Sequence, residues 1–191
     1  MKVYRCESKA TDRKYCFVSR HISPFDGPMS EGKPLTPVLE KKGASRVELD
    51  LDEDRGGLEL PDLVGGRLNY LVMRNAVAAA IAAKFKLDPH DEAPVALINS
   101  KKRLHSGDYT VVNPHGHVDC LDPEQSELDG SDEMFVRIFG KWALKASAIP
   151  KDRDIFRVQG LASGYIFSER LVDFILEKKY TNFKFADVTV S

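Results

Sequence analysis

Six short stretches between residues 94 and 160 have the composition of β-strands, and the connections between them are short, at most 11 residues. They are residues 94–99, 108–113, 117–121, 133–139, 141–149 and 154–160. Connections this short leave little room for the helical crossovers that join parallel strands, so they favour antiparallel neighbours. This feature constrains the fold more than any other, and it predicts an antiparallel or mixed β-sheet.

Two other segments each combine a short apolar strand with a following helix. In the first, Tyr70 to Met73 form the strand, Asn75 is the expected N-cap, and the helix covers about 76–86. In the second, residues 165–167 form the strand and Ser168 is the expected N-cap. The apolar residues of the second helix fall at one-face spacing: Leu171, Val172, Ile175 and Leu176. The two segments are either a weak internal repeat or a chance recurrence of a common pattern.

These elements predict an α+β fold: an antiparallel or mixed β-sheet with two principal helices. Residues 47–52 alternate apolar and acidic side chains, and this period of two predicts a strand with one apolar and one acidic face. Residues 1–45 contain a stretch punctuated by proline and glycine, so we expect this part to be loop-rich. A chain of 191 residues can build one good core or two small cores joined tightly, and we expect a single domain over 1–191.

The stretch VVNPHGHVDCLD, residues 111–122, contains an H-x-H-x-D pattern of metal-ligating residue types at 115–119. A metallohydrolase site of this kind needs further ligands, and no histidine follows His117. Asn113-Pro114 is a turn dipeptide and Gly116 can adopt a positive φ, so the stretch predicts a hairpin between residues 108–113 and 117–121. We therefore expect no catalytic residues, no metal and no cofactor, and a metal-dependent hydrolase using residues 115–119 is the alternative.

Acidic residues gather in two stretches of a chain whose formal net charge is only -1. One lies at residues 48–54, and the other lies in the window 116–136, which holds no lysine or arginine. Such stretches are either solvated polar faces or surfaces that complement a basic partner. The candidate partner-binding residues are Glu48, Asp50, Asp52, Asp119, Asp122, Glu124 and Glu127.

The overall composition limits which partners and which cellular compartment we expect for the protein. A net charge of -1 does not favour nucleic acid or a membrane surface as a partner, and self-association is possible but not indicated. Charges interrupt the N-terminal residues throughout, and the longest strongly apolar run, residues 76–83, is too short to cross a bilayer. The three cysteines are widely spaced and form no C-x-x-C motif. We therefore expect the cysteines to remain reduced and the protein to act in the cytoplasm.

Four short motifs in the second half of the chain resemble a bacterial family of polymorphic-toxin immunity proteins, the Myxococcus-type immunity domain. They are the strand Tyr109 to Asn113, Leu121-Asp122 with Ser126, Ile155-Phe156-Arg157, and the step Ser168-Glu169. The resemblance is strongest over about residues 94–187. It implies a non-enzymatic cytoplasmic protein that binds a cognate toxin and blocks the toxin's active site or a movement that the toxin needs. The family transfers no catalytic residues and no fixed binding residues to this chain.

Overall fold

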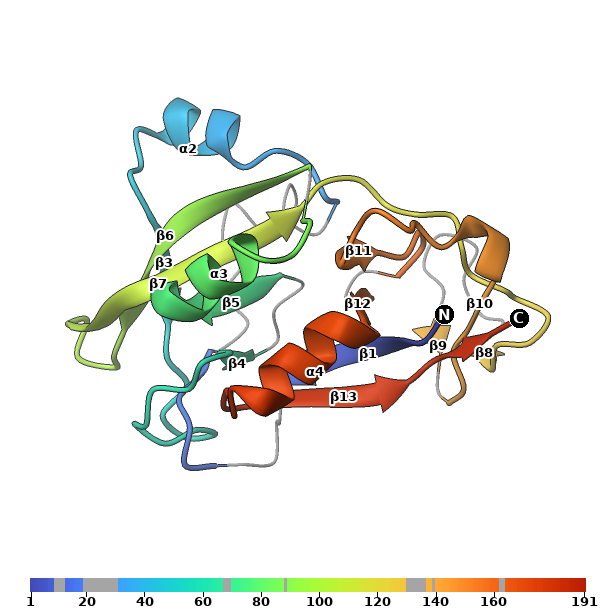
Figure 1. Ribbon diagram of the computed structural model, residues 1–191. Coiled ribbons are helices and arrows are strands. Elements are labelled where there is room, and N and C mark those ends of the chain that lie inside the picture. The colour runs from blue at the N-terminus through green and yellow to red at the C-terminus, as the bar shows by residue number, and fades with distance from the viewer. Residues whose placement is uncertain are drawn as a thin grey trace.

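The computed structural model of the protein contains two four-stranded sheets (Figure 1). Side chains from both sheets and from two helices form a common core. The structure describes residues 1–8, 13–18, 31–66, 70–87, 89–129, 137–138, 140–161 and 164–191. The first sheet has the strand order β3-β6-β7-β5, and the second has the order β11-β12-β1-β13. Three two-stranded pairs complete the strands: β2 with β4, β8 with β9 and β10 with β14. The α+β prediction is confirmed.

The first sheet is built on a long antiparallel hairpin of β6 (His90–Ile98) and β7 (Leu104–Pro114). On one side β6 pairs in parallel with β3 (Val47–Asp50), and on the other side β7 pairs with β5 (Leu71–Arg74). The sheet is therefore mixed, as the sequence predicts. Val47 and Leu49 are buried and Glu48 is exposed, so the alternating pattern of β3 is confirmed.

The second sheet is entirely antiparallel and places β1 (Val3–Ser8) between strands from the other end of the chain. β1 pairs with β12 (Tyr165–Ser168) on one side and with β13 (Phe183–Asp187) on the other. β11 (Ile155–Arg157) pairs with the far side of β12. The N-terminal segment, expected to be loop-rich, thus supplies an inner strand of the second sheet.

Short strands and one 3-10 turn join these sheets to the loops. They are β2 (Phe17–Val18), β4 (Gly65–Gly66), β8 (Leu128–Asp129), β9 (Arg137–Ile138), β10 (Ala143–Leu144), η1 (Ala146–Ala148) and β14 (Thr189–Val190). Of the strand predicted over 133–139, only residues 137–138 lie within the described residues. The stretch 141–149 forms a two-residue strand and then the 3-10 turn instead of one strand.

The prediction of two principal helices is wrong, because the described residues contain three short α-helices of similar length. They are α2 (Thr36–Lys42), α3 (Asn75–Ala82) and α4 (Glu169–Glu177). The prolines around α2 predict a loop, but a proline is compatible with the first turn of a helix, and Pro37 lies in the first turn of α2. Gly43, with φ +62°, then closes α2, and its N–H donates to Glu40 O at 3.0 Å.

The ends of the other helices agree only in part with the sequence. Asn75 is the first residue of α3 and not its N-cap, and the helix ends at Ala82. Ser168 does cap α4, and its hydroxyl accepts a hydrogen bond from Leu171 N at 3.4 Å. Leu176, expected on the buried face of α4, is 60% exposed, and Phe174 is buried in its place.

Replacing Ser168 with alanine should lower the free energy of unfolding by about 1 kcal/mol, because the first turn of α4 loses its side-chain cap. The hydroxyl also donates to the buried carboxylate of Asp154, which adds to the loss. Urea denaturation monitored by circular dichroism gives the difference. Ser45→Ala, at an exposed position outside any helix, is the control and should leave stability unchanged. Equal stability of the two variants would contradict this role of Ser168.

The main core lies where the two sheets and the helices α3 and α4 meet. Met73 and Val112 come from the first sheet, Phe167 comes from the second, and Ile81 and Leu171 come from α3 and α4. A second cluster lies around β3, β6 and β7, and a third lies between the second sheet and β10. None of the helices in the described part is long and apolar enough to cross a membrane.

The hairpin predicted at Asn113 to Gly116 is wrong. β7 continues through Pro114, and the chain then leaves the first sheet for the second. Val118 forms a parallel bridge with Val158, and Leu121 forms an antiparallel bridge with Leu144. A return strand has no free edge to occupy, because β7 is already paired with β6 on one side and with β5 on the other. Gly116 does have a positive φ of 70°, but it turns the chain between sheets.

Candidate functional site

The first acidic stretch lies on β3 and the turn that follows it, and three of its carboxylates are paired with nearby cations. Glu48 accepts a hydrogen bond from Arg46 at 2.7 Å. Asp50 lies 2.9 Å from Lys102 Nζ, and Asp52 lies 3.7 Å from Arg55 Nε. Exposed pairs of this kind stabilise the fold little, but they neutralise the acidic charge that the sequence suggests. These three carboxylates therefore form a charge-balanced surface with the cations beside them.

The second acidic stretch is described over residues 116–129, which follow the crossover from β7 and end in β8. Asp122 is buried in it, and its carboxylate accepts hydrogen bonds from Ser191 Oγ at 2.7 Å and from Glu124 N at 3.1 Å. The hydrogen bond from Ser191 holds the pKa of Asp122 below its usual range. Asp122 thus fastens the loop to Ser191, and its carboxylate is turned inward.

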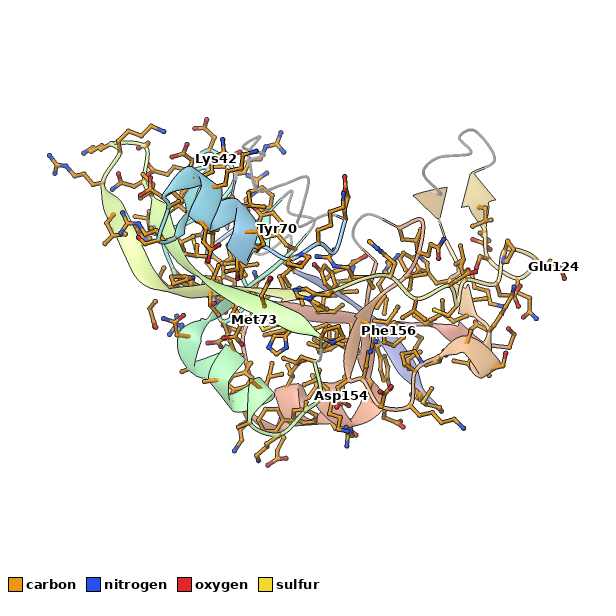
Figure 2. All side chains as sticks on the ribbon, turned by 90° about the horizontal axis from the view of Figure 1, so that it is seen from above. Lys42, Tyr70, Met73, Glu124, Asp154 and Phe156 are labelled. Carbon is orange, nitrogen blue, oxygen red and sulfur yellow. The ribbon has the colours of Figure 1, made fainter. Side chains whose placement is uncertain are left out.

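The other three candidate partner-binding residues of this stretch, Asp119, Glu124 and Glu127, are exposed. Glu127 accepts a hydrogen bond from the backbone N–H of Lys141 at 3.1 Å. Among the described residues, none of the three carboxylates takes part in an ion pair. We name these three residues the acidic loop. Glu124 lies at one extremity of the molecule (Figure 2), and β3 lies toward the opposite end (Figure 1), so the structure does not bring the two acidic stretches together.

The histidines of the H-x-H-x-D pattern lie at the crossover between the sheets. His115 Nε2 is 3.0 Å from Asp91 Oδ1, and His115 N donates to Pro89 O at 2.8 Å. Asp91 also accepts hydrogen bonds from Leu35 N at 2.7 Å and from Asn113 Nδ2 at 2.9 Å. His115 therefore faces a carboxylate that already holds a loop and a strand in place.

The part of the chain that the structure describes contains no group of three or more His, Cys, Asp or Glu side chains placed to hold a metal ion. Cys120, which follows the pattern, is fully buried, and its burial and the nearby Asp119 raise its pKa to about 11. A thiol with such a pKa stays protonated at neutral pH and is a poor nucleophile or metal ligand.

A buried arginine joins the two sheets next to His115. Arg157 of β11 is 2% exposed, and its guanidinium donates to Asn113 Oδ1 at 3.0 Å and to Pro114 O at 3.1 Å. The same guanidinium stacks on the ring of Tyr165, 4.5 Å from its centroid. Asn113 Nδ2 in turn donates to Lys33 O at 2.9 Å. This cluster holds β7, β11, β12 and the segment before α2 together.

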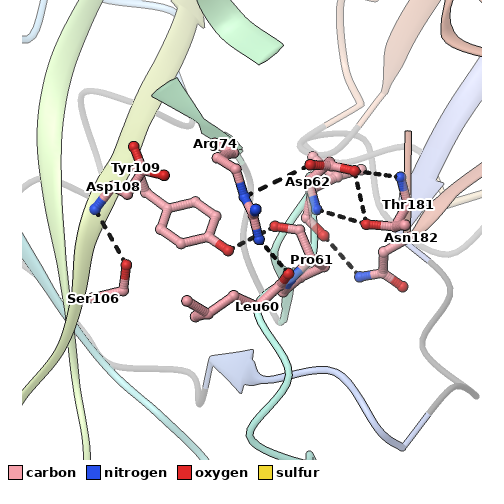
Figure 3. Close-up of polar contacts among 10 residues, drawn as sticks. Leu60, Pro61, Asp62, Arg74, Ser106, Asp108, Tyr109, Thr181 and Asn182 are labelled. Atoms are coloured by element: carbon pink, nitrogen blue, oxygen red, sulfur yellow. Dashed lines mark hydrogen bonds and ion pairs between the residues drawn. The ribbon is translucent and has the colours of Figure 1, made fainter. Parts of the chain in front are cut away.

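Figure 3 shows another polar cluster, which ties the segment before β4 to both sheets. Asp62 accepts hydrogen bonds from the backbone N and the hydroxyl of Thr181 at 2.7 and 2.9 Å. Arg74 Nε lies 3.6 Å from Asp62 Oδ1, and Tyr109 OH donates to Pro61 O at 2.6 Å. Thr181 precedes β13, whereas Arg74 and Tyr109 belong to the first sheet.

The sequence did not predict the two polar clusters around Arg157 and Asp62. For Arg157 a signal was present, because a charged residue between apolar neighbours in a buried strand must be paired. Asp62 and Thr181 carry no such signal, because they are polar residues in turns and are far apart in the chain.

No protein-family model matches the chain, and no curated protein matches it.

Proposed function

We propose that the chain is a non-enzymatic cytoplasmic immunity protein that binds a cognate bacterial toxin and blocks it. One observation carries this proposal: the motifs that resemble the immunity family meet one another in the structure. Asn113 of the first motif accepts a hydrogen bond from Arg157 of the third at 3.0 Å. Arg157 also stacks on Tyr165 of β12, the strand that ends in the Ser168-Glu169 step.

The remaining motif residues also make structural contacts. Asp122 O accepts a hydrogen bond from Ser126 N at 3.1 Å, and Tyr109 OH reaches Pro61 O at 2.6 Å. Leu121 of the second motif packs against the core cluster that contains Phe156 of the third. Motifs that lie together in this way are better explained as the signature of one shared scaffold than as separate coincidences. In such a family the scaffold is common, and the exposed residues that contact a toxin differ from one member to the next.

Of the two acidic stretches that the sequence suggests, we take the acidic loop as the candidate toxin contact. Its three carboxylates are exposed and take part in no ion pair among the described residues. Three exposed carboxylates at one end of the molecule would attract a toxin with a basic active-site rim and speed its capture. Inhibition would then follow from occlusion of the toxin's active site, with affinity supplied by a few buried anchor residues.

Co-expression with the toxin encoded beside this gene tests the proposal. We expect the wild-type chain to restore growth, and reversal of the acidic loop charge in D119K/E124K/E127K to weaken rescue. A matched control, E40K/D152K/E177K, reverses three exposed carboxylates elsewhere and should rescue as the wild type does. Failure of the wild type to restore growth would contradict the immunity function. Full rescue by D119K/E124K/E127K would contradict only the contact through the acidic loop.

A further inference from the structure

The two four-stranded sheets have four outer strands, and other parts of the backbone run beside three of them. They are β5, beside which residues 62–64 run, β11, which is bonded to Val118, and β3, whose end is bridged to β2. The fourth outer strand is β13, on the lower side of the second sheet in Figure 1. An outer strand that is left open is a template for pairing with another extended chain.

The register of β1 shows which backbone groups of β13 face outward. Lys2 O accepts a hydrogen bond from the residue after β12 at 3.3 Å, so the even-numbered residues of β1 direct their N–H and C=O groups to β12. The odd-numbered residues direct theirs to β13, where Arg5 lies opposite Ala186. Because the direction alternates along a strand, Phe185 and Asp187 point their backbone groups away from β1.

These outward groups form a short gap in an edge that is otherwise covered. The backbone N–H and C=O groups of Phe185 and Asp187 that face outward have no partner among the described residues. Phe185 is half-buried and Asp187 is exposed, whereas Phe183, which also points outward, is 5% exposed. Before the gap, Leu63 N donates to Thr181 O at 3.3 Å, and after the gap β14 pairs with β10. The open part of β13 is therefore recessed between two flanking segments.

An extended polypeptide complements this gap, and other partners fit it less well. Phe185 and Asp187 are two residues apart, so they repeat a donor and an acceptor at a spacing of about 7 Å, as a strand partner does. A phosphate backbone offers acceptors alone and would leave both carbonyl groups unpaired. A second copy of the chain would present a β13 recessed between the same flanking segments, and two recessed edges do not reach each other. Side-chain charge selects no partner, because β13 carries one cation, Lys184, and one anion, Asp187.

We infer that β13 is the docking strand for an extended segment of the toxin, which adds to the second sheet beyond β13 through backbone hydrogen bonds to Phe185 and Asp187. The inference rests on the proposed function for the identity of the partner, and it assigns the contact that holds this partner. The ring of Phe185 lies 6.0 Å from that of Phe167 and 6.1 Å from that of Phe183, between centroids. An apolar side chain of the added segment would therefore pack beside Phe185.

Hydrogen exchange at single backbone amides tests the inference, measured by NMR on the labelled chain alone and with the unlabelled toxin encoded beside this gene. We expect the amides of Phe185 and Asp187 to exchange fast in the free chain and at least about tenfold more slowly in the complex. The amides of Lys184 and Ala186, which face β1, should be protected in both states. A complex in which Phe185 and Asp187 still exchange fast would overturn the inference. So would protection in the free chain that rises with its concentration, because this would indicate a second copy in the gap.

A proline at the edge provides a second measurement. Asp187→Pro removes an outward N–H and places a ring at the gap, but it removes no hydrogen bond to β1. Asp187→Ala is the matched control, because it removes the same carboxylate and keeps the N–H. In calorimetry with the toxin we expect Asp187→Pro to weaken binding by about tenfold or more and Asp187→Ala to stay within about twofold of the wild type. Circular dichroism checks that both variants fold, and the exchange measurement needs neither variant.

The outcomes separate this inference from the proposed function. Equal affinities of Asp187→Pro and Asp187→Ala, in a wild-type chain that binds the toxin and restores growth, would overturn only the docking strand. A wild-type chain that neither binds the toxin nor restores growth would overturn the proposed function and, with it, this inference.

Discussion

Replacing Arg157 with methionine is expected to lower the free energy of unfolding by about 3 kcal/mol or more, because the change removes one partner of a buried polar cluster. Asn113 Oδ1 and Pro114 O would each lose a charged donor, at a site where water cannot easily replace it. Methionine retains much of the arginine's volume, so the loss would report hydrogen bonds and charge more than a cavity.

Urea denaturation of the Arg157→Met protein gives the size of the effect. Arg103→Met is the matched control, since Arg103 is exposed and forms no ion pair within the described residues, and it should change stability by less than about 0.5 kcal/mol. A double-mutant cycle with Asn113→Ala should show that the two substitutions are not additive. Unchanged stability of Arg157→Met would show that the cluster does not hold the two sheets together.

Replacing Asp154 with asparagine should lower the free energy of unfolding by about 2–4 kcal/mol, because this buried carboxylate accepts hydrogen bonds from three residues in two segments. Lys86 N donates to it at 2.9 Å, Ser168 Oγ at 2.5 Å and Arg170 Nε at 2.6 Å. An amide has a single acceptor oxygen, and its NH₂ group would face donors. Asp152→Asn, at an exposed position two residues earlier, is the control and should be neutral.

The same substitution should alter the dependence of stability on pH. Burial acts to raise the pKa of Asp154, but hydrogen bonds from Arg170, Ser168 and Lys86 outweigh it and hold the pKa below its usual range. A lowered pKa stabilises the folded state fully above the unfolded value of about 3.9, and this stabilisation is lost as the pH falls through the folded pKa. The stability difference between wild type and Asp154→Asn should therefore shrink below about pH 4. A difference that stays constant into acid would contradict this assignment.

Some local patterns in the sequence predicted the local structure correctly. The alternation of Val47 and Leu49 with Glu48 predicted β3, and Ser168 predicted the start of α4, because both signals depend on neighbours within a few residues. The place of each strand in a sheet was not predictable. β1 pairs with β12 and β13 through contacts between distant segments, for which the sequence carries no local signal.

The candidate site was predictable only as a set of residue types. The sequence identified acidic stretches, but exposure and pairing depend on what the fold places beside each carboxylate. Asp122 is held by Ser191 and Asp50 by Lys102, both distant in the chain. The turn residues Asn113 and Pro114 were misinterpreted for the same reason, since the partner of Asn113 is Arg157 on another sheet.

The position of β1 has a consequence for how the chain folds during synthesis. Residues 3–8 leave the ribosome early, whereas their partners, residues 165–168 and 183–187, are translated long afterwards. Until then β1 has two unpaired edges, which are a hazard for aggregation. The first sheet, whose strands lie between residues 47 and 114, can form before the second. The second sheet can therefore close only once residues 183–187 have been synthesised, by bringing together distant parts of the chain, and its closure is expected to be the slow step of folding.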